Sequence, residues 1–162
     1  MQTKMLNLSV QYAVRRARVP TPLQIRKWAL AALRRPAEIT FRIVGKAEGR
    51  MLNRDFRGKD YATDVLTFAY PGTEQLSGDI ALCAPVVARA ARERGKNLQA
   101  HYAHLVVHGV LHLQGYSHER KTEAEVMEKL EAQIITGLGF PDPYQCEAYA
   151  VRGGVRRMGI LP

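Results

Sequence analysis

The chain has 162 residues, carries a formal net charge of +9, and is 46% apolar. This length suits one domain with a single hydrophobic core, and no apolar run reaches the roughly 18 to 20 residues that a membrane-spanning helix needs. The charge predicts attraction to polyanions, with RNA or DNA ahead of acidic lipid, because no basic amphipathic membrane helix stands out.

The start of the chain and its cysteines predict a cytoplasmic protein. The first residues, MQTKMLNLSV, lack the basic start, the unbroken apolar run and the cleavage site of a secretion signal. The two cysteines, Cys83 and Cys146, lie far apart and neither belongs to a CxxC pair. We therefore expect two reduced thiols in a reducing compartment.

The first third of the chain predicts strand, helix, strand and helix. Alternating apolar residues indicate strands over residues 6–14 and 38–45. The helix between them has Thr21 as its cap and Pro22 in its first turn. A short helix over residues 46–58 is expected to stop at its terminal glycine. On the first helix, four apolar residues are expected to share a buried face: Leu23, Trp28, Leu30 and Leu33.

The middle of the chain predicts a hairpin, and three helices follow it. Strands over residues 63–71 and 78–85 are joined by a short, turn-rich connection, which favours antiparallel pairing. Helices are expected over residues 84–95, 97–115 and 121–139. The last of these helices has apolar residues at helical spacing: Val126, Leu130, Ile134 and Leu138.

The order of these elements predicts an α+β fold. Strands and helices alternate at first and segregate later, which favours one mixed four-stranded sheet packed with about five helices over a doubly wound fold. The first strand–helix–strand unit should be a right-handed crossover. We expect one domain over residues 1–162, in which residues 140–162 form a partly ordered, basic C-terminal extension.

A histidine cluster predicts a metal site. All five histidines lie within residues 101–118. His108 and His112 are four residues apart, so a helix places them on one face, one turn apart. Gly115 can end the helix and turn the chain sharply, which would let His118 swing back. This spacing equals the ligand spacing of the metzincin motif HExxHxxGxxH, so we expect one zinc ion bound by these three histidines.

The other two histidines have less defined roles. His104 continues the helical column by one turn, and it is either a partner of a ligand, a substrate contact or a plain buried histidine. His101 is expected to lie on the surface rather than to act in the site.

Three protein ligands would leave one open position on the metal, which indicates catalysis. In zinc peptidases a glutamate follows the first histidine and passes a proton to the leaving amine. Gly109 occupies that place, which disfavours peptide hydrolysis. Phosphodiester cleavage needs a cation more than this base. The best source is the segment with Arg54, Arg57 and Lys59, because an arginine fork fits a phosphate.

At this point the residues resemble a known family. The segments HGVLHLQGYSH (108–118), LNRDFRGKDYATDVLTFAYP (52–71) and SGDIALC (77–83) look like those of the YbeY family, bacterial metal-dependent endoribonucleases of rRNA maturation. The resemblance implies an α+β fold with a mixed four-stranded sheet. It also implies a cleft in which zinc is held by three histidines, which fall on His108, His112 and His118.

The resemblance also implies an activity. Arg57 falls on the arginine of the family's RGKD segment, where it would contact phosphate and act with His112 in catalysis. Single-strand-specific RNA cleavage, maturation of the 3′ end of 16S rRNA, ribosome quality control and association with the ribosome or small-subunit proteins are implied as well.

One residue departs from the family pattern. Ser117 stands where the family usually has an aspartate, before the third histidine. A carboxylate there would orient a histidine or help to bind the ion, whereas serine brings no charge. Glu119 and Asp79 are candidate replacements. Two other functions stay open: a non-catalytic ribosome-associated factor with a structural zinc and, less favoured, a zinc peptidase.

Overall fold

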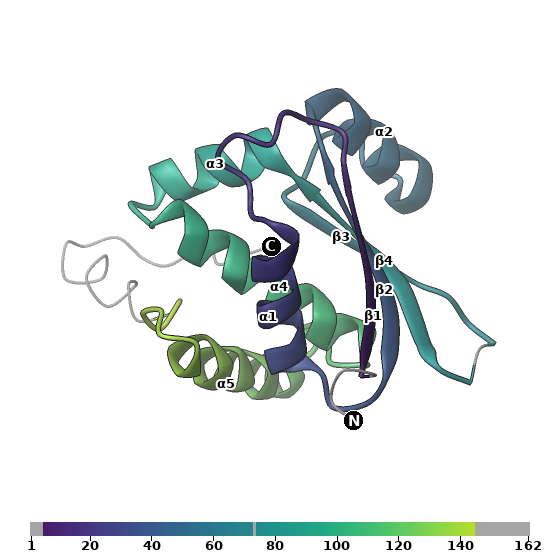
Figure 1. The fold of residues 1–162 in the computed structure, drawn as a ribbon, viewed down its shortest axis with the longest axis vertical. Coiled ribbons are helices and arrows are strands. Elements are labelled where there is room, and N and C mark those ends of the chain that lie inside the picture. The colour runs from purple at the N-terminus through teal and green to yellow at the C-terminus, as the bar shows by residue number, and fades with distance from the viewer. Residues whose placement is uncertain (1–4, 73, 145–162) are drawn as a thin grey trace.

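A twisted four-stranded sheet forms the centre of the fold (Figure 1). The computed structural model describes residues 5–72 and 74–144. The strands lie in the order β1-β2-β4-β3, with β1, β2 and β4 parallel and β3 antiparallel to β4. This pairing confirms the predicted mixed sheet and the antiparallel hairpin. The strands are β1 (Leu6–Tyr12), β2 (Ala37–Val44), β3 (Val65–Ala69) and β4 (Leu76–Cys83).

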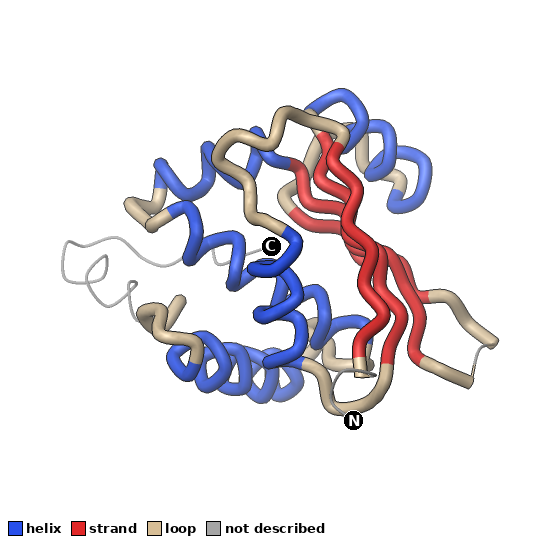
Figure 2. Tube along the Cα trace, in the orientation of Figure 1, coloured by secondary structure: helices blue, strands red, loops and turns tan. Residues whose placement is uncertain are grey.

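Five helices lie on the two sides of this sheet within the described residues, which makes the fold α+β as expected. Helices α1, α4 and α5 lie on one side of the sheet and α2 lies on the other (Figure 2). The expected extension from residue 140 onward is described as far as residue 144, and residues 145–162 lie outside the described part, as does Cys146. The helices are α1 (Pro22–Ala32), α2 (Lys46–Arg57), α3 (Ala84–Glu93), α4 (Leu98–Leu113) and α5 (Lys121–Gly137).

Helix α4 is the central helix of the core. It contacts β3 and β4 on one side and α1, α3 and α5 on others, and most of its side chains are buried. A helix enclosed in this way is apolar around nearly its whole circumference. Across the described residues, no helix combines the length and apolar character required to cross a membrane. The enclosure of α4 fixes the direction in which its histidines point.

Helix α1 begins as predicted and buries Trp28 and Leu33 as expected, with Leu30 partly buried, but not Leu23. Thr21 Oγ1 accepts a hydrogen bond from Gln24 N at 3.2 Å, and the Gln24 side chain accepts one from Thr21 N at 2.9 Å, a reciprocal cap. Leu23 is 79% exposed, so its predicted burial is wrong. It lies on the side of the helix opposite to the buried face, whose residues follow the i, i+3, i+4, i+7 spacing: Ile25, Trp28, Ala29 and Ala32.

The face of helix α5 that packs on the core differs slightly from the face predicted by its apolar spacing. Val126 is 58% exposed, whereas Leu130, Ile134 and Leu138 pack against the core while partly buried. The fully buried column lies one position later in the sequence and contains a carboxylate. Its members are Met127, Glu131 and Ile135.

Candidate metal centre

Helix α4 and the turn after it bring three histidines together. His108 and His112 lie one turn apart on α4. Gly115 has φ 102°, a conformation that favours glycine, and its N–H donates to the His112 carbonyl at 3.0 Å. The Tyr116 N–H donates to the Leu111 carbonyl at 3.2 Å, which closes the helix end. The chain then reverses, and His118 returns to the two helical histidines.

The three rings surround one point. The ring centres lie 6.2 Å apart for His108 and His112, 5.5 Å for His108 and His118, and 5.9 Å for His112 and His118. Imidazoles bound tetrahedrally to one zinc ion would have ring centres about 5 Å apart, so these rings stand slightly wider. Across residues 5–72 and 74–144, no group of three His, Cys, Asp or Glu side chains is close enough to hold an ion as it stands. His112 and His118 are both exposed.

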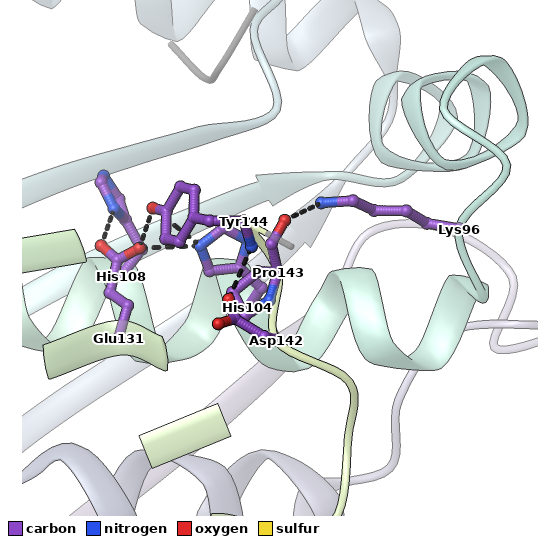
Figure 3. A network of polar contacts seen from close by, with 7 residues as sticks. All are labelled: Lys96, His104, His108, Glu131, Asp142, Pro143 and Tyr144. Atoms are coloured by element: carbon purple, nitrogen blue, oxygen red, sulfur yellow. Dashed lines mark hydrogen bonds and ion pairs between the residues drawn. The ribbon is translucent and has the colours of Figure 1, made fainter. Parts of the chain in front are cut away.

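A buried carboxylate supports the first of these histidines. Glu131 of α5 has 0% exposure. Its Oε2 accepts a hydrogen bond from His108 Nδ1 at 2.6 Å, and its Oε1 accepts one from His104 Nε2 at 2.8 Å (Figure 3). A carboxylate is only an acceptor, so both ring nitrogens must carry the hydrogen. The remaining nitrogen of His108, Nε2, is left as an available metal ligand.

The segment after α5 completes this network. The Tyr144 hydroxyl donates to Glu131 Oε1 and lies 3.4 Å from His104 Nε2. Tyr144 N–H donates to Asp142 Oδ1 at 2.8 Å, and Lys96 Nζ donates to the Pro143 carbonyl at 3.3 Å (Figure 3). Residues 142–144 are therefore tied both to the carboxylate and to the loop that precedes α4.

These contacts set the charge state of the groups. Burial acts to raise the pKa of Glu131, but the hydrogen bonds from His104 and His108 prevail and lower that pKa to about 2. Glu131 is thus a carboxylate at neutral pH. The pKa of His112 is lowered, first by desolvation and further by the nearby His108, His118 and Arg57. A neutral imidazole is the form that binds a metal.

Arg57 reaches the centre from the other side of β3. It is the last residue of α2, and its guanidinium donates to the Thr67 carbonyl on β3. The guanidinium carbon lies 5.6 Å from the centre of the Phe68 ring. The charge of Arg57 is also one of the causes that lower the pKa of His112.

Gly109 faces the sheet and not the histidines. A Cβ atom at this position would lie 3.1 Å from Ile80 Cδ1 and 3.3 Å from Thr67 Cγ2. Ile80 has 0% exposure, so little space exists for a larger residue. The place that holds the catalytic glutamate in HExxH peptidases is therefore filled here by the packing of α4 on β3 and β4.

Comparison with known proteins decides the family. A model of the family described as "Endoribonuclease YbeY" matches residues 14–139. The chain belongs to the YbeY family. Two similar proteins named endoribonuclease YbeY come from Aromatoleum aromaticum and Nitrosomonas europaea. The first is 62% identical over 142 residues, covering 86% of this chain and 92% of that protein. The second is 57% identical over 139 residues, covering 86% of this chain and 85% of that protein.

A solved structure shares the fold. The solution structure of TM1509 from Thermotoga maritima superposes with a TM-score of 0.54 and 24% sequence identity, covering 82% of this chain and 91% of that chain. At this level of identity the likeness shows the fold alone. It agrees with the α+β architecture that the YbeY resemblance implied.

The carboxylate beside the histidines is neither Glu119 nor Asp79, the two candidate replacements for the aspartate of the YbeY motif. Ser117 Oγ accepts from Glu119 N–H at 3.1 Å, so the serine closes a turn, and Glu119 is exposed. Asp79 accepts from the Tyr70 hydroxyl. It points to the face of β4 away from α4, because its neighbour Ile80 contacts α4 and side chains alternate along a strand. Glu131 was missed, and its place in an apolar helical repeat was the available signal.

His101 was expected at the surface, and that expectation is wrong. His101 is 2% exposed, and neither of its ring nitrogens has a hydrogen-bond partner among the described residues. Its place on the enclosed face of α4 explains the burial. Desolvation, with Lys96, His104 and Arg94 adding to it, lowers the pKa of His101 to about 3.

This buried histidine should make the fold sensitive to acid. In the unfolded chain His101 takes up a proton below about pH 6.5, whereas the folded chain resists until about pH 3, so stability is lost as the pH falls between these values. The contribution of His101 to the free energy of unfolding should decrease by about 2 kcal/mol between about pH 7.5 and about pH 5. Urea unfolding of the metal-free protein should show this decrease, and His101→Leu should lose about that much less over the same range. An equal acid dependence in the variant and the wild type would contradict the assignment.

Proposed function

We propose that this chain is a metal-dependent endoribonuclease that hydrolyses phosphodiester bonds in single-stranded RNA. One zinc ion per chain would be held by His108, His112 and His118. The substrate would be rRNA, with a role in 16S 3′-end maturation and ribosome quality control, in the cytoplasm and in association with the ribosome. The observation that carries the proposal is the convergence of three histidines beside Arg57 in a member of the YbeY family.

Arg57 and the three histidines would have different roles in the reaction. Arg57 would bind a phosphate oxygen and balance the charge that grows there, and its bond to the Thr67 carbonyl holds it in place. His108, His112 and His118 would present ring nitrogens to the ion, which when bound acts as a Lewis acid and lowers the pKa of water. Arg57 is one of the charges that lower the pKa of His112, so His112 is the proposed ligand that we pair with Arg57 in catalysis.

A groove lies near Arg57 on the α2 face of the sheet, the face opposite to α4, and offers aromatic rings to unpaired bases. Its volume is about 540 Å³, and its lining includes Phe56, Phe68 and Tyr70. Phe56 is 66% exposed and Tyr70 is 48% exposed, so their rings are accessible to unpaired bases, which stack on aromatic side chains. The groove also holds Glu48 and Asp79, which are paired with Arg42 and Tyr70. The net charge of +9 favours binding of a polyanion such as RNA, and the basic extension over residues 140–162 is a further candidate for contact with it.

One preparation tests the function against its alternatives. Bound metal is quantified first, and single-stranded RNA, duplex RNA and a peptide are then offered to the same protein. We expect cleavage of single-stranded RNA alone. Metal without any cleavage would favour a ribosome-associated factor with a structural zinc. RNA cleavage that persists undiminished in both His112→Ala and Arg57→Ala would identify a contaminating nuclease.

Arg57→Ala should separate phosphate binding from metal binding. The side chain is exposed, so its loss should leave folding and metal content unchanged. Cleavage should fall by roughly 100-fold, the usual effect of removing one group that stabilises transition-state charge. Arg54→Ala is the matched control, because Arg54 is an exposed arginine on the same helix and pairs with Asp55. Equal activity in the two variants would remove Arg57 from the proposed mechanism.

A further inference from the structure

The support of His108 by Glu131 has a chemical consequence at the opposite nitrogen. A neutral imidazole carries one hydrogen, on either Nδ1 or Nε2. Glu131 Oε2 lies 2.6 Å from Nδ1 of His108 and can only accept, so the hydrogen is held on Nδ1. The lone pair is then on Nε2. In water a free neutral histidine prefers the other tautomer, so the protein must impose this one.

From this geometry we infer that Glu131 is the positioning residue of the metal centre, fixing His108 in the tautomer and orientation in which Nε2 is a ready ligand. The inference rests on the metal site of the proposed function. It assigns to α5 the carboxylate that the YbeY motif would place at position 117, where this chain has serine.

The surroundings of Glu131 fit this task. The side chain has 0% exposure and points between His104 and His108, which lie one turn apart on α4. A buried carboxylate is tolerated here because it accepts three hydrogen bonds. His104 and Tyr144 donate to Oε1, and His108 donates to Oε2. His104 and Tyr144 therefore hold the carboxylate, and the carboxylate holds His108.

Two substitutions at position 131 separate charge from hydrogen bonding. Glu131→Gln keeps the shape but places an amide –NH2 toward one of the two histidines, which must then change tautomer. Glu131→Met keeps the length and removes every acceptor, so His108 should move to the tautomer with the hydrogen on Nε2. Glu125→Gln is the matched control, because it makes the same charge change at an exposed site of α5.

Two readouts that do not depend on RNA cleavage test the inference. The first is zinc affinity, measured by competition with a chromophoric chelator. We expect affinity to fall by about 10-fold to 100-fold in both position-131 variants, the usual effect of losing a carboxylate behind a ligand, and to stay unchanged in Glu125→Gln. The second is the tautomer of His108 in the metal-free protein, read from its ring nitrogen chemical shifts. Wild type should have hydrogen on Nδ1 and Glu131→Met should have it on Nε2.

The outcomes distinguish this inference from the proposed function. A wild-type His108 that carries its hydrogen on Nε2 would overturn the inference, as would zinc affinities in folded Glu131→Gln and Glu131→Met equal to that of Glu125→Gln. A wild type that binds zinc with these effects but cleaves no RNA would refute the proposed function and leave the inference in place. Tyr144→Phe removes one donor to the carboxylate, and its zinc affinity should fall by a smaller factor than that of Glu131→Gln.

Discussion

Replacement of His112 by alanine should remove metal binding and RNA cleavage while leaving the fold intact. The His112 ring centre lies 6.2 Å from that of His108 and 5.9 Å from that of His118, so it forms one corner of the three-histidine cluster. Two remaining imidazoles would bind an ion far more weakly than three. We expect zinc affinity and the rate of cleavage each to fall by at least about 100-fold.

The exposure of the His112 side chain allows an effect on metal binding to be separated from an effect on folding. His112 is exposed although its neighbours Leu111 and Leu113 are buried, so the alanine variant creates no core cavity. Its thermal unfolding in the metal-free state should match that of the metal-free wild type. His118→Ala, at an exposed position outside the helix, should reproduce the loss of metal and of cleavage. Normal cleavage by a folded His112→Ala protein would rule out the proposed three-histidine centre.

Gly109→Glu should prevent stable folding and should not create a peptidase. The substitution restores the HExxH pattern in sequence, yet a Cβ atom at position 109 would already lie 3.1 Å from Ile80 Cδ1 and 3.3 Å from Thr67 Cγ2, which leaves no space for the rest of a glutamate. A glutamate there would place an unpaired carboxylate against buried apolar groups, which costs several kcal/mol. Against a total stability of about 5 to 15 kcal/mol, we expect at least about 3 kcal/mol to be lost.

Gly109→Ala is the control for this prediction. Alanine gains about 1 kcal/mol of helix propensity over glycine, but its methyl group would press on Ile80 and the overpacking costs about 1 to 3 kcal/mol. We expect a net loss of about 1 kcal/mol, with zinc binding retained. Denaturant unfolding of the metal-free proteins measures both changes. A stable Gly109→Glu protein that hydrolyses peptides would show that the tight packing around Gly109 does not exclude the peptidase base.

Sequence patterns predicted the backbone of the site better than its surroundings. The helix, the glycine turn and the ligand spacing are local, so residues 108–118 alone were sufficient to expect three converging histidines. The approach of Arg57 depends instead on how α2 packs across β3. The motif resemblance suggested that residue, but the Thr67 carbonyl that holds it is a tertiary contact.

Buried polar side chains were the main failure. The apolar spacing on α5 suggested a face through Val126, whereas the core-facing column includes Glu131 one position later than Leu130. An analysis of hydrophobic periodicity counts a carboxylate as a surface residue. It therefore predicts a buried face that excludes the carboxylate. The predicted exposure of His101 was wrong for the same reason, since a polar ring without hydrogen-bond partners among the described residues is not expected inside a core.

The carboxylate behind His108 stands on the last helix of the described fold. A growing chain therefore presents its three histidines, which end at residue 118, before Glu131 and Tyr144 have been made. Until α5 docks on α4, the Glu131 acceptor that would hold the hydrogen of His108 on Nδ1 is missing, so the inference above predicts a lower affinity for an ion at that stage. Metal capture would then follow completion of the fold, so that a chain truncated within α5 would stay unloaded and inactive toward RNA.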